Sequence, residues 1–150
     1  MSTPRSPLFV DTGPLYARFN QADQNHERAL QVFEAVRDDR LATAPLYTSR
    51  YVLAETTRLL LYHVDHATAV RALSAVRESA LFMILVVNDE TFDRACAEFS
   101  RYDDQGISLT DHISAILAED VGADQVCSFD SDFRTLEFGL VPADIDSDSL

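Results

Sequence analysis

The sequence contains no lysine, so all 12 of its basic residues are arginines. They are outnumbered by 25 acidic residues, which gives a net charge of −13. The excess lies in residues 89–150, which hold 16 acids and three arginines, whereas residues 1–88 hold nine of each. The C-terminal part should therefore repel nucleic acid unless cations intervene. An acidic surface without lysine also suits a protein adapted to high salt, and ordinary acidic solubility with a bias toward arginine is the alternative.

Long apolar runs are missing as well. A membrane-spanning helix needs about 18 apolar residues, whereas the longest run here, Leu81–Val87, has the length of a strand. The first residues, Met1–Pro7, carry no apolar leader of the kind that directs secretion. We therefore expect a protein that has no membrane contact and works in the cytoplasm.

Cysteine is scarce. Cys96 and Cys127 stand 31 positions apart, which excludes a CxxC redox pair and a zinc knuckle. His63 and His66 have a spacing that fits one helix face, but no further ligand nearby completes a tetrahedral zinc site. We expect buried free thiols, and histidines at the surface or at helix ends. The chemistry of this chain must come from other residue types.

Apolar runs of strand length alternate with helix-spaced patterns along the chain. Strands are predicted at Leu8–Val10, Leu46–Thr48, Phe82–Val87, Val126–Phe129 and Leu136–Val141. Helices are predicted at Gln24–Arg40, Ser49–Tyr62, Asp65–Ala80, Asp89–Tyr102 and Asp111–Val121. The expected N-caps are Ser49, Asp65, Asp89 and Thr110, and Gly122 should end the last helix in a left-handed conformation.

This alternation predicts an α/β fold, a three-layer sandwich with a central, mostly parallel sheet. The run Phe82–Val87 suits a strand covered on both faces. Turns or breaks are expected at Asp11–Pro14, at 103–106 and at Asp130–Asp132. With 150 residues, 47% of them hydrophobic, the chain should form one domain. Its core would span about residues 8–141, and the acidic tail at 142–150 should fray over Asp144–Leu150.

Acidic residues follow two of the predicted strands directly. Asp11 comes after the first strand and Asp130 after the strand Val126–Phe129, so both should lie at one edge of the sheet if these strands are parallel neighbours. Asp111 falls in the first turn of a predicted helix, another place where such sheets build sites. Glu55 lies in an apolar-rich stretch in which no solvent-facing position is obvious.

Carboxylates held a few ångströms apart repel one another unless a cation neutralises them. Oxygen ligands without a His or Cys cluster select hard ions, here one or two Mg²⁺ or Mn²⁺ ions with Asp132 as a possible extra ligand. Such a centre activates water for attack on a phosphodiester. For each acid alone the alternative is local, because aspartates at strand ends and N-caps often only accept backbone hydrogen bonds. A phosphorylated Asp11 is disfavoured, since Gly13 stands where such enzymes place a second aspartate.

Four segments that contain these acids resemble, in order and spacing, the motifs of PIN-domain nucleases. They are Phe9–Ala17, Ser49–Thr56, Ser108–Ala115 and Ser128–Phe133. The resemblance covers about residues 8–141 and is closest in size to the VapC-type toxins of toxin–antitoxin pairs. It implies a PIN-like fold and an Mg²⁺- or Mn²⁺-dependent ribonuclease. The acids that it implies as metal ligands are Asp11, Glu55, Asp111 and Asp130, with Asp132 as a possible fifth.

The resemblance also implies that the hydroxyls of Thr12 and Ser128 orient carboxylates or water. It implies RNA as substrate, a homodimer, and a small antitoxin that covers the site. Arg18, Arg50 and Arg58 lie near the motifs in sequence and are candidates for phosphate contacts, with solvated surface arginines as the alternative. Within the family, a housekeeping RNA-processing enzyme and a non-catalytic RNA- or protein-binding module are the alternatives to a toxin.

Overall fold

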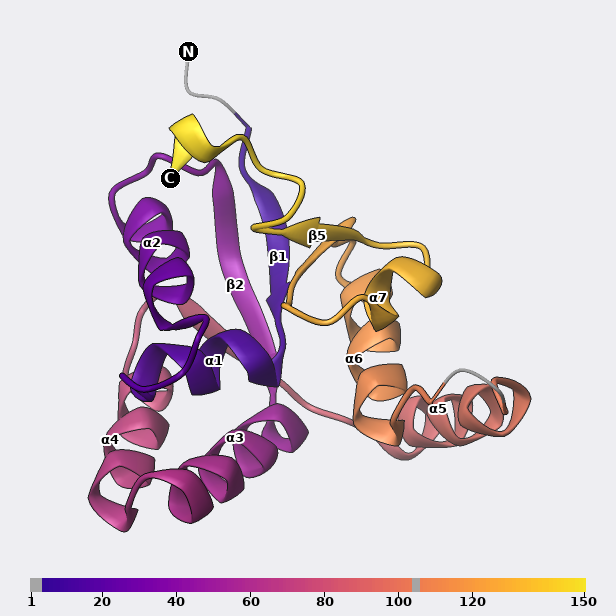
Figure 1. Cartoon of the computed structure of the whole chain (residues 1–150). Coiled ribbons are helices and arrows are strands. Elements are labelled where there is room, and N and C mark those ends of the chain that lie inside the picture. The colour runs from indigo at the N-terminus through magenta and orange to yellow at the C-terminus, as the bar shows by residue number, and fades with distance from the viewer. Residues whose placement is uncertain (1–3, 104–105) are drawn as a thin grey trace.

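The structure is a computed structural model that describes residues 4–103 and 106–150. Its centre is a five-stranded sheet in which all neighbouring strands are parallel (Figure 1). In chain order the strands are β1 (Ser6–Val10), β2 (Thr43–Ser49), β3 (Phe82–Leu85), β4 (Gln125–Cys127) and β5 (Gly139–Val141). Their order across the sheet is β3-β2-β1-β4-β5. Each overlaps a strand predicted from the sequence.

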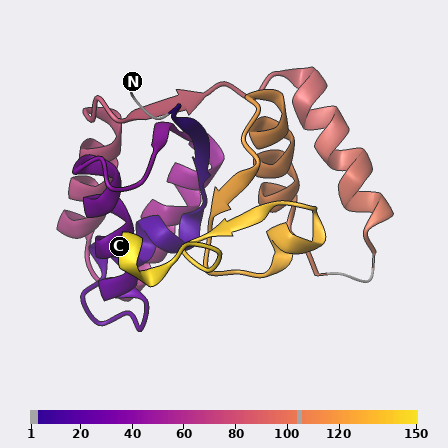
Figure 2. The same cartoon turned by 90° about the horizontal axis from the view of Figure 1, so that it is seen from above.

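Helices connect the strands and cover both faces of the sheet. They are α1 (Thr12–Phe19), α2 (His26–Arg37), α3 (Arg50–His63), α4 (His66–Arg77), α5 (Asp89–Arg101), α6 (Leu109–Asp120) and α7 (Asp132–Thr135), followed by the 3-10 helix η1 (Ser147–Ser149). Helices α1 to α4 lie on one side of the sheet, and α5 and α6 lie on the other (Figure 2). The predicted α/β three-layer fold is confirmed. Over residues 4–103 and 106–150, no helix is long and apolar enough to cross a membrane.

The order of the strands reverses direction beside β1. From β1 the chain adds β2 and then β3 on one side, and it afterwards returns to add β4 and β5 on the other. Because parallel crossovers are right-handed, this reversal also moves the connecting helices to the opposite face. Strands β1 and β4 thus become neighbours, paired from Leu8 with Gln125 to Val10 with Cys127. In such sheets, ligands bind beyond the carboxyl ends of the two strands at the reversal.

The central strand is buried on both faces. Leu8, Phe9 and Val10 are at most 1% exposed, which agrees with the apolar run that predicts β1. Of the two cysteines, Cys127 is buried in β4 and Cys96 is half-buried on α5, and both are free thiols as expected. Burial raises the pKa of the Cys127 thiol well above its ordinary value, so this thiol stays protonated and unreactive.

Three of the predicted helix boundaries are confirmed by their capping contacts. The Ser49 side chain accepts a hydrogen bond from the backbone N–H of Val52 at 3.3 Å, and Asp65 accepts one from Thr68 at 2.7 Å. Gly122 has a φ of +76°, the left-handed conformation that ends α6.

Two predicted N-caps are wrong by one or two residues. Asn88, rather than Asp89, caps α5 by accepting a hydrogen bond from the Thr91 N–H at 2.9 Å. Ser108, rather than Thr110, caps α6. In both cases the cap has extended backbone and lies three residues before the N–H that it accepts, whereas the predicted residue is already helical.

The prediction that Phe82–Val87 is a strand covered on both faces is wrong. Strand β3 ends at Leu85 and lies at the edge of the sheet, paired only with β2. Met83 is 52% exposed and Val86 is 69% exposed. A run of apolar residues therefore did not distinguish an edge strand from a central one.

Two helices replace predicted turns. Asp11–Pro14 was predicted to redirect the chain, but helix α1 begins at Thr12 directly after β1. Pro14 lies in the first turn of α1, where backbone N–H groups have no partner inside the helix. A proline, which lacks this N–H, therefore breaks no helical hydrogen bond there. Helix α7 begins at Asp132, so the predicted turn is shorter and the last strand starts only at Gly139.

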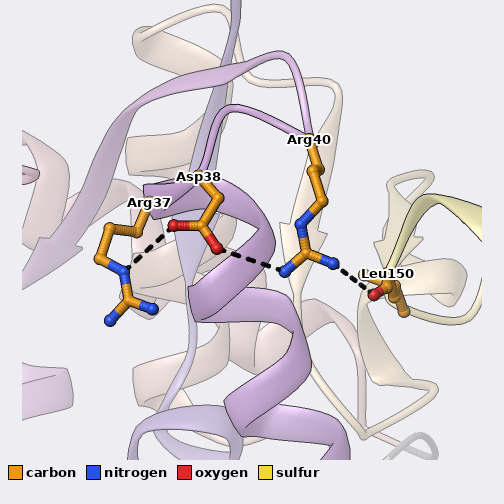
Figure 3. Close-up of polar contacts among 4 residues, drawn as sticks. All are labelled: Arg37, Asp38, Arg40 and Leu150. Atoms are coloured by element: carbon orange, nitrogen blue, oxygen red, sulfur yellow. Dashed lines mark hydrogen bonds and ion pairs between the residues drawn. The ribbon is translucent and has the colours of Figure 1, made fainter.

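The acidic tail is ordered against the body of the domain, contrary to the predicted fraying. Figure 3 shows Arg40 donating a hydrogen bond to the backbone oxygen of Leu150 at 2.7 Å, while Asp38 lies between Arg40 and Arg37. All these contacts are exposed, so each contributes little to stability. The predicted break at 103–106 falls partly on residues 104–105, which, like residues 1–3, lie outside the described residues.

Candidate active site

A cavity of about 660 Å³ opens beyond the carboxyl ends of β1 and β4. The four acids predicted from the sequence all line it, namely Asp11, Glu55, Asp111 and Asp130. They come from the end of β1, from α3, from α6 and from the loop after β4 (Figure 1). The structure therefore brings together side chains from four separate segments at the point where the strand order reverses.

Asp11 is the buried member of this group, with 6% of its surface exposed. Its backbone N–H donates to the Cys127 carbonyl at 3.0 Å, which continues the β1–β4 pairing by one residue. The Ser128 hydroxyl donates to Asp11 Oδ2 at 3.1 Å. The pKa of Asp11 is raised to about 7. Burial is the largest cause, and the nearby charges of Asp111 and Glu55 act in the same direction. A positive partner beside this carboxylate would therefore favour its ionised form.

Asp111, Asp130 and Asp132 offer carboxylate oxygens that lie within 4.8 Å of one another. Burial, then the charge of Asp130, raises the pKa of Asp111. Burial also raises the pKa of Asp132 to about 6, with the charges of Asp130 and Asp111 acting in the same direction. Asp132 does not line the cavity with the other four acids, but its N–H donates to Asp130 Oδ1 at 2.9 Å and fixes that side chain.

Asp111 combines a local role with its place in the cluster. Its Oδ2 accepts the N–H of Ser108 at 3.2 Å, while Ser108 Oγ accepts the N–H of Asp111 at 3.1 Å, which is a capping box at the start of α6. This arrangement fixes the carboxylate, and among residues 4–103 and 106–150 no hydrogen bond involves its Oδ1. The local and functional interpretations of this acid are therefore compatible.

Glu55 lies on the exposed side of α3 and reaches the cavity from there. The sequence left no obvious solvent-facing position for it, and this interpretation is wrong. The helix buries Val52, Leu53 and Thr56 instead, so Glu55 projects away from the core. Its charge acts on Asp11, because it contributes to the raised pKa of that residue.

Two hydroxyls predicted to assist the acids also line the cavity. Ser128 Oγ donates to Asp11 and accepts the N–H of Asp130 at 3.1 Å, so one hydroxyl links two of the acids. Thr12 Oγ1 is buried and has no hydrogen-bond partner among the described residues. Leaving such a group unsatisfied costs about 1–3 kcal/mol.

The residues present fit a hard dication. All the candidate ligand atoms are carboxylate oxygens, the donors that Mg²⁺ and Mn²⁺ prefer. Burial, and to a lesser extent the charges of neighbouring acids, raise the pKa values of Asp11, Asp111 and Asp132, and a bound cation would act against both effects.

The three arginines suggested as phosphate contacts do not line this cavity. Arg18 packs its guanidinium over the rings of Phe19 and Phe33, at 5.1 and 5.0 Å from their centres. Arg58 lies over Tyr62 on the outer side of α3, and Arg50 borders a separate groove against β3 and α4. These arginines are near the motifs in the sequence, but none of them lines the cavity that contains the acids.

Sequence reasoning gave no site role to five residues that line the cavity, namely Gly13, Leu59, Ser108, Phe129 and Ser131. Ser108 was assigned no role, although its spacing to Asp111 is that of a capping box and would have identified it. Phe129 was taken only as the end of a strand, yet its ring lines the cavity between Ser128 and Asp130. No local pattern distinguishes such an aromatic residue from a core residue.

The family model for the PIN domain matches residues 8–139. The chain belongs to the PIN domain family. The predicted resemblance is thereby confirmed, and the mostly parallel central sheet that was predicted is a five-stranded parallel sheet in this PIN domain. A search of curated proteins finds no match.

Solved structures include VapC-type relatives of this PIN domain. VapC20 of Mycobacterium tuberculosis, described as a toxin that cleaves the sarcin–ricin loop, is 28% identical, with a TM-score of 0.77 over 87% of this chain and 95% of its own. VapBC2 from Rickettsia felis, bound to a promoter DNA fragment, and FitAcB from Neisseria gonorrhoeae are each 14% identical over 89% of this chain. The matched regions span 96% of the VapBC2 chain and 95% of the FitAcB chain, with TM-scores of 0.61 and 0.63. Both structures show the same fold. The family match and the likeness to VapC20 support a nuclease.

Proposed function

We propose that this PIN domain is a metal-dependent endoribonuclease and the toxin of a toxin–antitoxin pair. The observation that carries the proposal is the gathering of Asp11, Glu55, Asp111 and Asp130 in one cavity at the strand-order reversal. The similarity to VapC20, a toxin that cleaves RNA at the sarcin–ricin loop, supports RNA as the substrate. We expect the protein to act in the cytoplasm, where such RNA is found.

In this proposal the acids of the cavity bind a cation, and the neighbouring serines orient those acids. Asp111, Asp130 and Asp132, whose carboxylate oxygens lie within 4.8 Å of one another, would hold an Mg²⁺ or Mn²⁺ ion. Asp11 and Glu55 lie outside that group but line the same cavity, and they would be further ligands of this ion or of a second one. Bound there, such an ion supplies positive charge and Lewis acidity beside a phosphodiester. Ser128 orients Asp11 by its hydrogen bond, and Ser108 holds Asp111 through the capping box. The Ser128 hydroxyl is committed to these contacts, so we assign the nucleophile to water.

The test is cleavage of defined RNAs, beginning with a hairpin that carries the sarcin–ricin loop. With Mg²⁺ or Mn²⁺ we expect cuts that leave a 3′-hydroxyl and a 5′-phosphate, because water would attack the phosphorus in line with the leaving oxygen. Chelation with EDTA should abolish cleavage, and added Mg²⁺ should restore it. Mapping of the cleaved ends decides the mechanism: a 2′,3′-cyclic phosphate, or cleavage that persists in EDTA, would refute it.

An antitoxin partner suits the electrostatics of the cavity. Four carboxylates line it, and none of its lining residues is basic. An arginine or lysine from a small partner would neutralise these acids in place of a cation and block the site. The likeness to VapBC2 supports such a partner. Purified antitoxin should inhibit cleavage in a one-to-one ratio with the toxin chain.

A homodimer would cover the exposed apolar side chains of α3 and α4. Leu61 is 52% exposed, Tyr62 74% and Val70 47%, and all three lie in the half of the sequence that carries no net charge. Two neutral apolar surfaces associate more readily than two strongly acidic ones.

We expect the wild type to behave as a dimer in light scattering and Val70→Arg to shift it toward monomer. The control Val86→Arg, at an exposed apolar position after β3, should leave the dimer intact. A monomeric wild type at micromolar concentration would contradict the dimer.

A further inference from the structure

One arginine contacts an aromatic residue that lines the acidic cavity, although nothing in the sequence pointed to it. The guanidinium carbon of Arg28, on α2, is 5.6 Å from the centre of the Phe129 ring. Phe129 in turn lines the cavity between Ser128, which holds Asp11, and Asp130. The pair therefore joins α2 to the loop after β4, on opposite sides of the strand-order reversal (Figure 1).

Arg28 forms no ion pair with a carboxylate in the described part of the chain. Six arginines form ion pairs with carboxylates, namely Arg5, Arg37, Arg40, Arg94, Arg101 and Arg134. Arg28 has no such pair among residues 4–103 and 106–150, and its side chain is exposed. Its contact is with the face of an aromatic ring. A cation–π contact uses the face of the guanidinium and leaves its N–H groups free to donate in the plane.

We propose that Arg28, held by Phe129, is a phosphate-binding residue that positions the RNA backbone over the acidic cavity. The inference rests on the proposed ribonuclease function. A cavity lined by four carboxylates repels the phosphates that flank the bond to be cut, even when cations are bound at the acids. The guanidinium of Arg28, placed beside the cavity by Phe129, would offset this repulsion, because its forked N–H donors match two phosphate oxygens. The ring restricts where the guanidinium can lie, so less of its freedom is lost on binding.

Phe129 has support of its own at this place. A Cβ built at Gly13, in the first turn of α1, would lie 3.9 Å from the Phe129 ring, which shows that the ring packs closely along the helix start. The ring is half-buried, so one part faces the protein while the remainder stays accessible to Arg28 and the cavity. The position of the arginine is thus fixed from the same loop that supplies Asp130.

The test compares Arg28→Ala with Arg77→Ala, which removes the same charge from an exposed arginine on α4. With a hairpin RNA and Mg²⁺, Arg28→Ala should raise KM about tenfold and change kcat by less than about twofold, since a charge-assisted contact is lost away from the reacting atoms. The Mg²⁺ concentration needed for half-maximal activity should stay the same. Arg77→Ala should behave as the wild type in every measurement.

Salt dependence separates a phosphate contact from a structural role. RNA binding measured on the Asp11→Asn background, which prevents cleavage, should show a slope of log affinity against log salt that is smaller by about 0.7 for Arg28→Ala. Arg28→Lys should keep the slope but recover only part of the affinity, because an ammonium lacks the planar fork. Phe129→Leu should weaken binding and keep most of the slope.

The outcomes distinguish this inference from the function on which it rests. If the wild type cleaves RNA and Arg28→Ala matches Arg77→Ala in both KM and salt slope, the inference is refuted and the function stands. If Arg28→Ala lowers kcat and melting temperature together, the role is structural and the inference is also refuted. If the wild type neither binds nor cleaves RNA with Mg²⁺ or Mn²⁺, the proposed function fails, and the inference with it.

Discussion

Replacing Asp11 with asparagine should slow RNA cleavage about 10²- to 10³-fold, although the two side chains have the same shape. Asp11 is the buried acid of the cavity, and no other acid occupies its place at the end of β1. An amide keeps the hydrogen bond from Ser128 but removes the negative charge that would hold a dication. Single-turnover cleavage with excess enzyme measures the loss without interference from product release.

Asp93→Asn provides the matched control for this experiment. Asp93 is exposed on α5 and does not line the cavity, so the same chemical change there should leave the rate within about twofold of the wild type. A smaller loss is expected for Glu55→Gln than for Asp11→Asn, because Glu55 is exposed and water can replace it as a ligand. Equal rates for Asp11→Asn and Asp93→Asn would favour a non-catalytic PIN-like module that retains its acids.

The acids at strand ends were predictable because their positions depend on chain order. Asp11 and Asp130 each follow a strand, and alternation of strands and helices predicts a parallel sheet whose carboxyl ends share an edge. That reasoning needs only local patterns and the right-handed crossover rule. It brings the two residues together despite a separation of 119 positions in the chain.

The features that sequence reasoning missed depend on contacts that local patterns do not encode. Phe82–Val87 is equally apolar at the edge or in the centre of a sheet, and only the pairing of β3 decides its exposure. The contact between Arg28 and Phe129 joins residues 101 positions apart on different layers, so no spacing rule finds it. Helix α1 was missed for a different reason, because glycine and proline in its first turn have the signature of a loop.

The same Asp11→Asn variant should be more stable than the wild type at pH 8 in EDTA, while it is nearly inactive. The pKa of Asp11 rises from 3.8 to about 7 on folding, because burial disfavours its charge. An acid with a raised folded pKa contributes stability that is fully present below about pH 3.8 and is lost as the pH rises through about 7. At about 1.4 kcal/mol per pKa unit, the loss attributable to Asp11 is on the order of 4 kcal/mol at most.

Thermal melts at pH 5 and pH 8 measure this effect as a difference between two proteins. All titrating groups except Asp11 are shared, so the difference in Tm between Asp11→Asn and the wild type reports Asp11 together with its interactions with Asp111 and Glu55. In EDTA we expect the Tm of the variant minus the Tm of the wild type to rise by several degrees from pH 5 to pH 8. Each kcal/mol of stability corresponds to about 2–4 °C in a chain of this size. Added Mg²⁺ at pH 8 should reverse the order, because it stabilises the wild type, whose carboxylates bind it, and has little effect on the variant. A variant that melts below the wild type at pH 8 in EDTA would mean that the Asp11 charge is already compensated within the protein, and the cavity would then have no electrostatic need for a cation.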